Sequence, residues 1–185
     1  MGPAIDPAGP LCQSVVCQQA SCPPMSLAAL SRQLTAGQSS SRGQLERCLA
    51  AIDDPHGEGE RTFLAVHRER ALAEAERTDA LRRTGASLPV LAGIPVSIKD
   101  LFDEAGAVTL GASKVRRGAS PAQRDSVVVE RLRSAGLIIV GRTNMTEFAY
   151  SGLGLNPHYG TPRNPWDRAT GRVPGGSSSG AAVSL

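Results

Sequence analysis

Apolar residues recur at helical spacing directly after Met25, where ordered patterning begins. Leu27, Leu30 and Leu34 fall on one face of a predicted helix, and Gly37 is placed to end it. By contrast, residues 1–24 are rich in Pro, Gln, Cys and small residues and show no periodicity. We therefore expect a disordered extension over residues 1–24 and a folded region over residues 25–185.

A second helix is predicted after residue 40. Ser41 and Gln44 have the spacing of a capping box, and the run 54–57 (Asp-Pro-His-Gly) ends the pattern. The residues on its apolar face are Leu45, Cys48, Leu49 and Ile52. Because Cys48 lies on that face, it is interpreted as a small core residue and not as a reactive thiol.

A short apolar run at 63–66 precedes a third helix, which is rich in Ala, Glu and Arg and extends to about Thr84. Ala71, Ala75 and Thr78 are expected to face inward, and Gly85 to stop the helix. The charged residues of this helix are predicted to form a solvated face.

Two strands follow, with a helix between them. Residues 93–98 place Ile94, Val96 and Ile98 on one side, whereas Ser97 and Lys99 point to the other. Lys99 therefore leaves the strand end on the face opposite the apolar set. Residues 137–140 are typical of a buried strand that ends at Gly141.

The helix between these strands is predicted to be capped by Asp125 and closed by Gly136. Its inward residues are expected to be Val128, Leu132 and Ala135. A further short helix is predicted over 144–150. Residues 151–176, with their glycines and prolines, are expected to form a long ordered loop or a site-forming segment.

Alternation of helices and strands predicts an α/β fold with a mixed, largely parallel sheet flanked by helices. Such folds place ligands in the loops at strand ends and helix starts.

Composition narrows the function. The hydrophobic fraction of 41% and the charged fraction of 20% fit a globular protein, and the net charge is +3 with scattered basic residues. A nucleic-acid footprint is therefore not indicated, and no apolar stretch has the length of a membrane span. The four cysteines and three histidines follow no metal-ligand spacing. The absence of a metal site and a cytoplasmic location are the expectations.

The segment 173–182 (Val-Pro-Gly-Gly-Ser-Ser-Ser-Gly-Ala-Ala) is the strongest chemical feature. Its composition also fits a flexible linker. However, a serine on a glycine turn and a lysine at a strand end can work together, because a neutral lysine can accept a proton from a hydroxyl. Ser177 and Lys99 are the residues in those two places.

These motifs resemble the amidase signature family. The resemblance rests on 93–100 (Gly-Ile-Pro-Val-Ser-Ile-Lys-Asp), on 141–149 (Gly-Arg-Thr-Asn-Met-Thr-Glu-Phe-Ala), on the pair of Asn-Pro segments between 156 and 167, and on 173–182. Four motifs in the family's order, over about residues 26–185, carry the interpretation. The resemblance implies hydrolysis of a carbon–nitrogen amide bond by a Ser–cis-Ser–Lys mechanism on a small-molecule amide, with no metal or organic cofactor.

The resemblance also implies roles for individual residues. Lys99 matches the general base. Ser177 matches the serine that follows a cis peptide bond and relays the proton. Ser151 matches a loop that lines the substrate site, although a turn serine is an equal interpretation. Trp166 is interpreted as a packing residue.

The family's nucleophilic serine and oxyanion-hole amides belong to a second glycine-rich segment beyond Leu185. The chain is therefore expected to be the N-terminal part of an amidase-signature domain, inactive and unstable alone. The alternatives are the amidase subunit of a tRNA-dependent amidotransferase, a catalytically inactive truncated product, and an anion- or nucleotide-binding module. A homodimer of the full-length protein is left open.

Overall fold

A three-stranded sheet in the order β1-β3-β2 organises residues 25–184, the residues that this computed structural model describes. The strands are β1 (Phe63–Val66), β2 (Pro95–Lys99) and β3 (Ile138–Thr143). Strand β3 pairs antiparallel with β1 and parallel with β2. The sheet is therefore mixed, as expected, although among the described residues it holds one parallel and one antiparallel pairing. The expected disordered extension at 1–24 lies outside the described residues.

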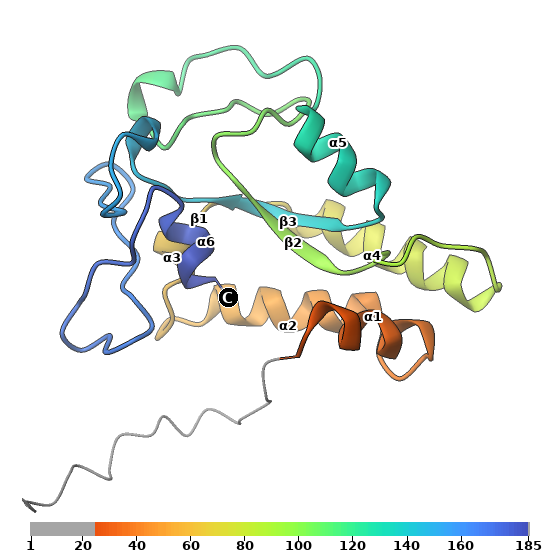
Figure 1. The fold of residues 1–185 in the computed structure, drawn as a ribbon. Helices are drawn as coiled ribbons and strands as arrows, with labels where there is room; N and C mark the ends of the chain where they lie inside the picture. The colour runs from red at the N-terminus through yellow and green to blue at the C-terminus, as the bar shows by residue number, and fades with distance from the viewer. Residues whose placement is uncertain (1–24, 185) are drawn as a thin grey trace, which may run out of the picture.

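Helices cover both faces of this sheet (Figure 1). They are α1 (Leu27–Thr35), α2 (Ser41–Asp53), α3 (Gly59–Thr62), α4 (Arg68–Arg83), α5 (Val127–Ser134) and α6 (Ser179–Val183), with short 3-10 turns η1 (Lys114–Arg116) and η2 (Glu147–Ala149). Alternation along β3 divides the core between the two faces. Ile138 and Val140 pack with α2 and α4 on one face, whereas Ile139 packs with α5 on the other.

The second helix begins one residue earlier than predicted. Ser40, not Ser41, is the N-cap of α2, and its hydroxyl accepts the N–H of Gly43. The N–H of Ser41 is instead bound by the carboxylate of Asp79, 2.9 Å away. Cys48 is exposed, so its interpretation as a core residue was wrong. The face that packs against the sheet carries Leu45 and Leu49.

The solvated face predicted for α4 was wrong at Asp79. Its side chain is buried against the first turn of α2, where it accepts the N–H groups of Ser41 and Arg42 and the Arg82 guanidinium. Burial opposes the charge, but the two backbone hydrogen bonds outweigh it and lower the pKa of Asp79. Asp79 therefore satisfies helix-start donors that would otherwise lack partners.

The helix α5 also begins differently from the prediction. Ser126 is its N-cap residue, and Asp125 binds the N–H of Ala105 and the Arg133 side chain instead. Val129 is buried, whereas Val128 is exposed, so the prediction was wrong for Val128. Leu132 packs against the buried cluster of Ile98, Val129 and Ile139, as predicted. Gly136 closes the helix with φ of +80°, as predicted.

Strand β3 runs through Gly141, where the sequence predicted its end. A Cβ at Gly141 would lie 2.3 Å from the carbonyl oxygen of Ala65, so glycine here allows β1 to approach closely. The predicted helix over 144–150 is reduced to η2. Residues 151–176 hold no helix or strand, in agreement with the predicted long loop. Every helix within 25–184 is too short or too polar to cross a bilayer.

Candidate active site

Lys99 is the last residue of β2, and its side chain reaches the glycine–serine segment. Its Nζ donates a hydrogen bond to Ser177 Oγ at 2.6 Å, between residues 78 positions apart in the sequence. Along β2, Ile98 is buried in the core while Lys99 is only partly buried. The period of the strand thus directs Lys99 away from the core and toward Ser177, as predicted.

The peptide bond between Gly176 and Ser177 is cis. The turn that carries it is packed too closely for side chains, because a Cβ at Gly176 would lie 2.5 Å from the nitrogen of Gly154. On the other side, the carbonyl oxygen of Ser177 accepts the N–H of Thr146 at 2.9 Å. The backbone on both sides of the Ser177 hydroxyl is therefore fixed by neighbouring loops.

The short helix α6 follows directly and anchors the turn to the sheet. The N–H of Gly180 donates to the carbonyl oxygen of Asn144 at 2.9 Å. The Asn144 amide in turn donates to the carbonyl oxygens of Arg61 and Gly160. Because the Gly180 N–H is occupied within the protein, α6 does not offer it to an anion, which weighs against an anion-binding module.

Burial lowers the pKa of the Lys99 amine, because a low-dielectric surrounding disfavours the ammonium form. A lowered pKa increases the neutral fraction, the form that can accept a proton. The amine and the Ser177 hydroxyl together form an arrangement that can move a proton from a second hydroxyl to Lys99.

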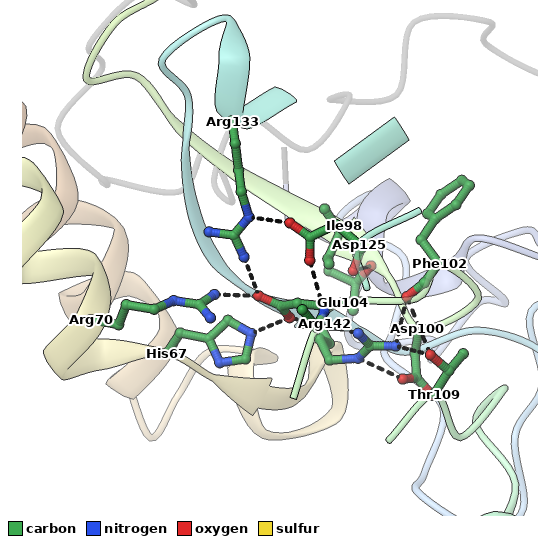
Figure 2. A network of polar contacts seen from close by, with 12 residues as sticks. His67, Arg70, Ile98, Asp100, Phe102, Glu104, Thr109, Asp125, Arg133 and Arg142 are labelled. Carbon is green, nitrogen blue, oxygen red and sulfur yellow. Dashed lines mark hydrogen bonds and ion pairs between the residues drawn. The ribbon is translucent and has the colours of Figure 1, made fainter. Parts of the chain in front are cut away.

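A buried ionic network surrounds Glu104, which follows the end of β2 in the sequence (Figure 2). The Glu104 carboxylate is fully buried and contacts the imidazole of His67 and three guanidinium groups, those of Arg70, Arg133 and Arg142. Burial alone would raise the pKa of Glu104, but the hydrogen bonds and charges of His67 and Arg70 lower it to about 2. This network was not predicted. Its signals in the sequence were Arg142 within an apolar strand and Asp100 directly after Lys99.

The structure does not bring Ser151 to Lys99 or Ser177 through a hydrogen bond. The Ser151 hydroxyl accepts the N–H of Leu153 at 3.3 Å, a local turn contact. Trp166 is 78% exposed, so its interpretation as a packing residue was wrong. The loop around it is held instead by backbone contacts such as that between Asn164 and Arg172. No three His, Cys, Asp or Glu side chains within residues 25–184 gather as a metal site.

With this geometry in place, comparisons with known proteins define the class. A family model described as Amidase matches residues 46–185. The chain therefore belongs to the amidase family, whose members are carbon–nitrogen hydrolases.

Two curated relatives show the range of the family. The chain is 43% identical over 152 residues to AtzE, the 1-carboxybiuret hydrolase subunit of Pseudomonas sp. (strain ADP), covering 82% of this chain and 33% of that protein. It is 41% identical over 162 residues to the A subunit of the glutamyl-tRNA(Gln) amidotransferase of Thermobifida fusca (strain YX), covering 87% and 32%. The chain thus spans about a third of the length of these relatives.

Solved structures agree with the fold. A structure described as a vestigial protein complex that reveals the evolutionary origins of an s-triazine catabolic enzyme matches with a TM-score of 0.81 and 42% identity, over 87% of this chain and 35% of that one. The native peptide amidase from Stenotrophomonas maltophilia matches with a TM-score of 0.74 and 34% identity, over 86% and 33%. The chain therefore has the amidase-signature α/β fold over part of the length of these proteins.

Proposed function

We propose that this chain supplies the general base and the proton relay of an amide hydrolase. Lys99 is the base, and Ser177 is the relay. The observation that carries the proposal is the 2.6 Å hydrogen bond from Lys99 Nζ to Ser177 Oγ at the glycine turn. Membership of the amidase family supports it, because its members cleave carbon–nitrogen bonds.

In the proposed reaction, a serine outside residues 1–185 attacks the amide carbonyl. Its proton passes to Ser177 Oγ, while the Ser177 proton passes to the neutral amine of Lys99. The tetrahedral adduct then collapses, and the proton held by Lys99 returns through Ser177 to the departing ammonia or amine. A water molecule hydrolyses the acyl-enzyme by the same transfers in a second cycle. No metal or organic cofactor enters this scheme.

The three consecutive serines of the glycine–serine segment are poor candidates for the nucleophile. Ser179 is fully buried in α6, and Ser178 precedes it with its carbonyl oxygen bound by the N–H of Ala182. Ser177 is the hydroxyl that Lys99 contacts, so it cannot be both the relay and the attacking group in this scheme. We therefore propose that residues 1–185 alone form no acyl-enzyme. Ser151 stays a proposed substrate-lining residue, because its turn contact leaves that role untested.

The substrate class has two candidates, because the relatives named above include subunits of both a hydrolase and an amidotransferase. We favour hydrolysis of a small free amide. The alternative is release of ammonia from glutamine for a partner protein. Ammonia release from free amides without added protein supports the first candidate, whereas release that depends on a second protein supports the other. Cytoplasmic location and a homodimer remain predictions.

The test begins with the intact mass of the protein from its natural source, which fixes the length to be assayed. Ammonia release from a panel of amides is then measured for the wild type, Lys99→Ala and Ser177→Ala. Each substitution should reduce kcat by about 100- to 10,000-fold, the range for loss of a proton-transfer group. Lys114→Ala is the matched control, because Lys114 is exposed and is the only other lysine of the chain.

Near wild-type turnover in Lys99→Ala or Ser177→Ala would contradict the proposal. Residues 1–185 should also stay unlabelled by a serine-directed acylating probe. A labelled serine within this range would overturn the placement of the nucleophile outside it. If the natural polypeptide itself ends at residue 185 and neither hydrolyses amides nor reacts with the probe, the inactive-product alternative is supported.

A further inference from the structure

Asp100 directly follows Lys99, and both its side chain and its backbone are hydrogen-bonded within the protein. Its side chain is 1% exposed. Carboxylate oxygen Oδ1 accepts Nε of Arg142 at 2.8 Å, and Oδ2 accepts the N–H of Ala112 at 2.8 Å. Its backbone N–H donates to the carbonyl oxygen of Thr143 at 3.1 Å, and its own carbonyl oxygen accepts the N–H of Gly111 at 3.0 Å.

The partner of Asp100 on the neighbouring strand is itself fixed. Arg142 is 3% exposed and pairs in register with Ile98, one residue before Lys99. Its Nη2 donates to the carbonyl oxygen of Phe102 at 3.0 Å and to Thr109 Oγ1 at 3.3 Å (Figure 2). The guanidinium therefore links β3 to Phe102 and Thr109, which follow Asp100 in the sequence. Arg142 thus contacts the residues on both sides of Lys99, because it pairs with Ile98 in the sheet and binds the Asp100 carboxylate.

The same contacts continue toward Ser177. Ala112 has φ of +50°, a conformation that alanine adopts rarely, and its N–H points at the Asp100 carboxylate. Its carbonyl oxygen accepts the amide of Asn156, which is buried and also donates to the carbonyl oxygen of Met145. The next residue, Thr146, donates its N–H to the carbonyl oxygen of Ser177. A continuous set of buried hydrogen bonds thus joins both ends of the Lys99–Ser177 contact.

We infer that Asp100 is a positioning residue that holds Lys99 against Ser177 by locking the end of β2 to Arg142 and to the turn at Ala112. This inference rests on the proposed function, because it assigns to Asp100 a task in the same proton transfer. Asp100 touches neither substrate nor the transferred proton. It acts through the backbone it shares with Lys99.

The decisive variant is Asp100→Asn. An amide keeps the shape of the side chain but has one oxygen and one NH₂ group, so it cannot accept both the Arg142 and the Ala112 donors. One of the two ties must break, which frees the end of β2. The probe is acetic anhydride, which acetylates neutral amines. Lys99 and Lys114 are the only lysines of the chain, so mass spectrometry of two peptides in the protein at its natural length gives both rates.

The readout is the pH profile of Lys99 acetylation divided by that of exposed Lys114. In Asp100→Asn the Lys99 amine should leave its partly buried position, and the midpoint of its profile should move up toward that of Lys114. Each unit of such a shift lowers the neutral fraction about tenfold at neutral pH. A merely structural role would lower the melting temperature without moving this profile.

Asp79→Asn is the matched control. Asp79 is also a buried carboxylate that accepts two backbone N–H groups and an arginine, but its partners are Ser41, Arg42 and Arg82. It should lose stability and keep the wild-type Lys99 profile. If Asp100→Asn does not fold, Arg142→Lys replaces it. That variant keeps the charge opposite Asp100, loses the ties to Phe102 and Thr109, and should shift the profile in the same direction.

An unchanged Lys99 profile in a folded Asp100→Asn or Arg142→Lys protein would overturn the inference. So would an equal shift in Asp79→Asn, because it would show that any loss of stability moves the amine. A different experiment tests the proposed function itself. Full amide turnover in Ser177→Ala would contradict that function, independently of whether Asp100→Asn shifts the Lys99 acetylation profile.

Discussion

Gly180 in α6 lies against Thr62 so closely that a Cβ on the glycine would stand 2.4 Å from the threonine carbonyl oxygen. The same Cβ would lie 2.7 Å from the nitrogen of Asn144. Both neighbours are backbone atoms, which cannot turn aside as a long side chain can. The contact therefore sets how near the helix start, and with it Ser177, can come to the sheet.

Gly180→Ala should push α6 away from Thr62 and destabilise the fold by about 2–3 kcal/mol, the scale of overpacking at a rigid site. Urea unfolding of the protein measures this effect. Gly118→Ala is the matched control, because Gly118 is exposed and a Cβ there meets nothing within 4 Å. It should change stability by less than about 0.5 kcal/mol. Equal stability of the two variants would contradict the packing described for α6.

Glu104 should make stability sensitive to acid. Burial opposes its charge, but the hydrogen bonds and charges of His67 and Arg70 lower its pKa from 4.5 to about 2. A carboxyl group whose pKa is lower in the folded state than in the unfolded state stabilises the fold fully at any pH above its unfolded-state pKa. For Glu104 this stabilisation is lost as the pH falls from about 4.5 toward 2. The difference between the two pKa values corresponds to a contribution of Glu104 to the free energy of unfolding on the order of 3 kcal/mol.

Glu104→Gln should therefore be less stable at neutral pH and should lose less stability than the wild type between pH 4.5 and 2. Urea unfolding at a series of pH values gives both curves. Glu46→Gln serves as the control, because Glu46 is exposed and its ion pair within residues 25–184 is with the surface residue Arg42. Parallel curves for wild type and Glu104→Gln would show that the carboxylate does not couple acid to unfolding.

The charged form of Lys99 should destabilise the folded state. Burial lowers its pKa in the folded state, so the unfolded state binds more protons between the folded and unfolded pKa values. Stability therefore rises with pH through that window, and below it the penalty is complete. Lys99→Met should raise stability at neutral pH, whereas Lys114→Met should leave stability unchanged. A loss of stability in Lys99→Met, measured by thermal unfolding, would contradict the destabilising effect of a charged, partly buried amine at this position.

The parts of the fold that follow from local pattern were predictable. Leu34 and Leu49 lie inward as their spacing indicated, and the alternation from Ile94 to Lys99 directed the lysine correctly. The Lys99–Ser177 contact was predictable because its residue types carry recognisable chemistry and matched family motifs. Local pattern alone would not have joined two residues 78 positions apart.

The errors arose where tertiary contacts override local preference. Ser40 caps α2 in place of the expected Ser41, and Asp79 binds the N–H groups of Ser41 and Arg42, because a buried carboxylate can accept two N–H groups at once. Gly141 continues a strand because β1 packs against it, although glycine usually interrupts one. The ionic network of Asp100, Glu104 and Arg142 joins separate elements, and no spacing in the sequence announces such a pairing.

The most direct test of the central claim is the pH dependence of acetylation at Lys99 relative to Lys114 in the protein at its natural length, with and without the Ser177 hydroxyl. If Lys99 is the base, its profile has a lower midpoint than that of Lys114. In Ser177→Ala its rate should rise about fivefold as a hydrogen bond of ordinary strength is removed. Two lysines with the same midpoint, and no effect of Ser177→Ala, would show that Lys99 and Ser177 do not act as a proton-transfer pair.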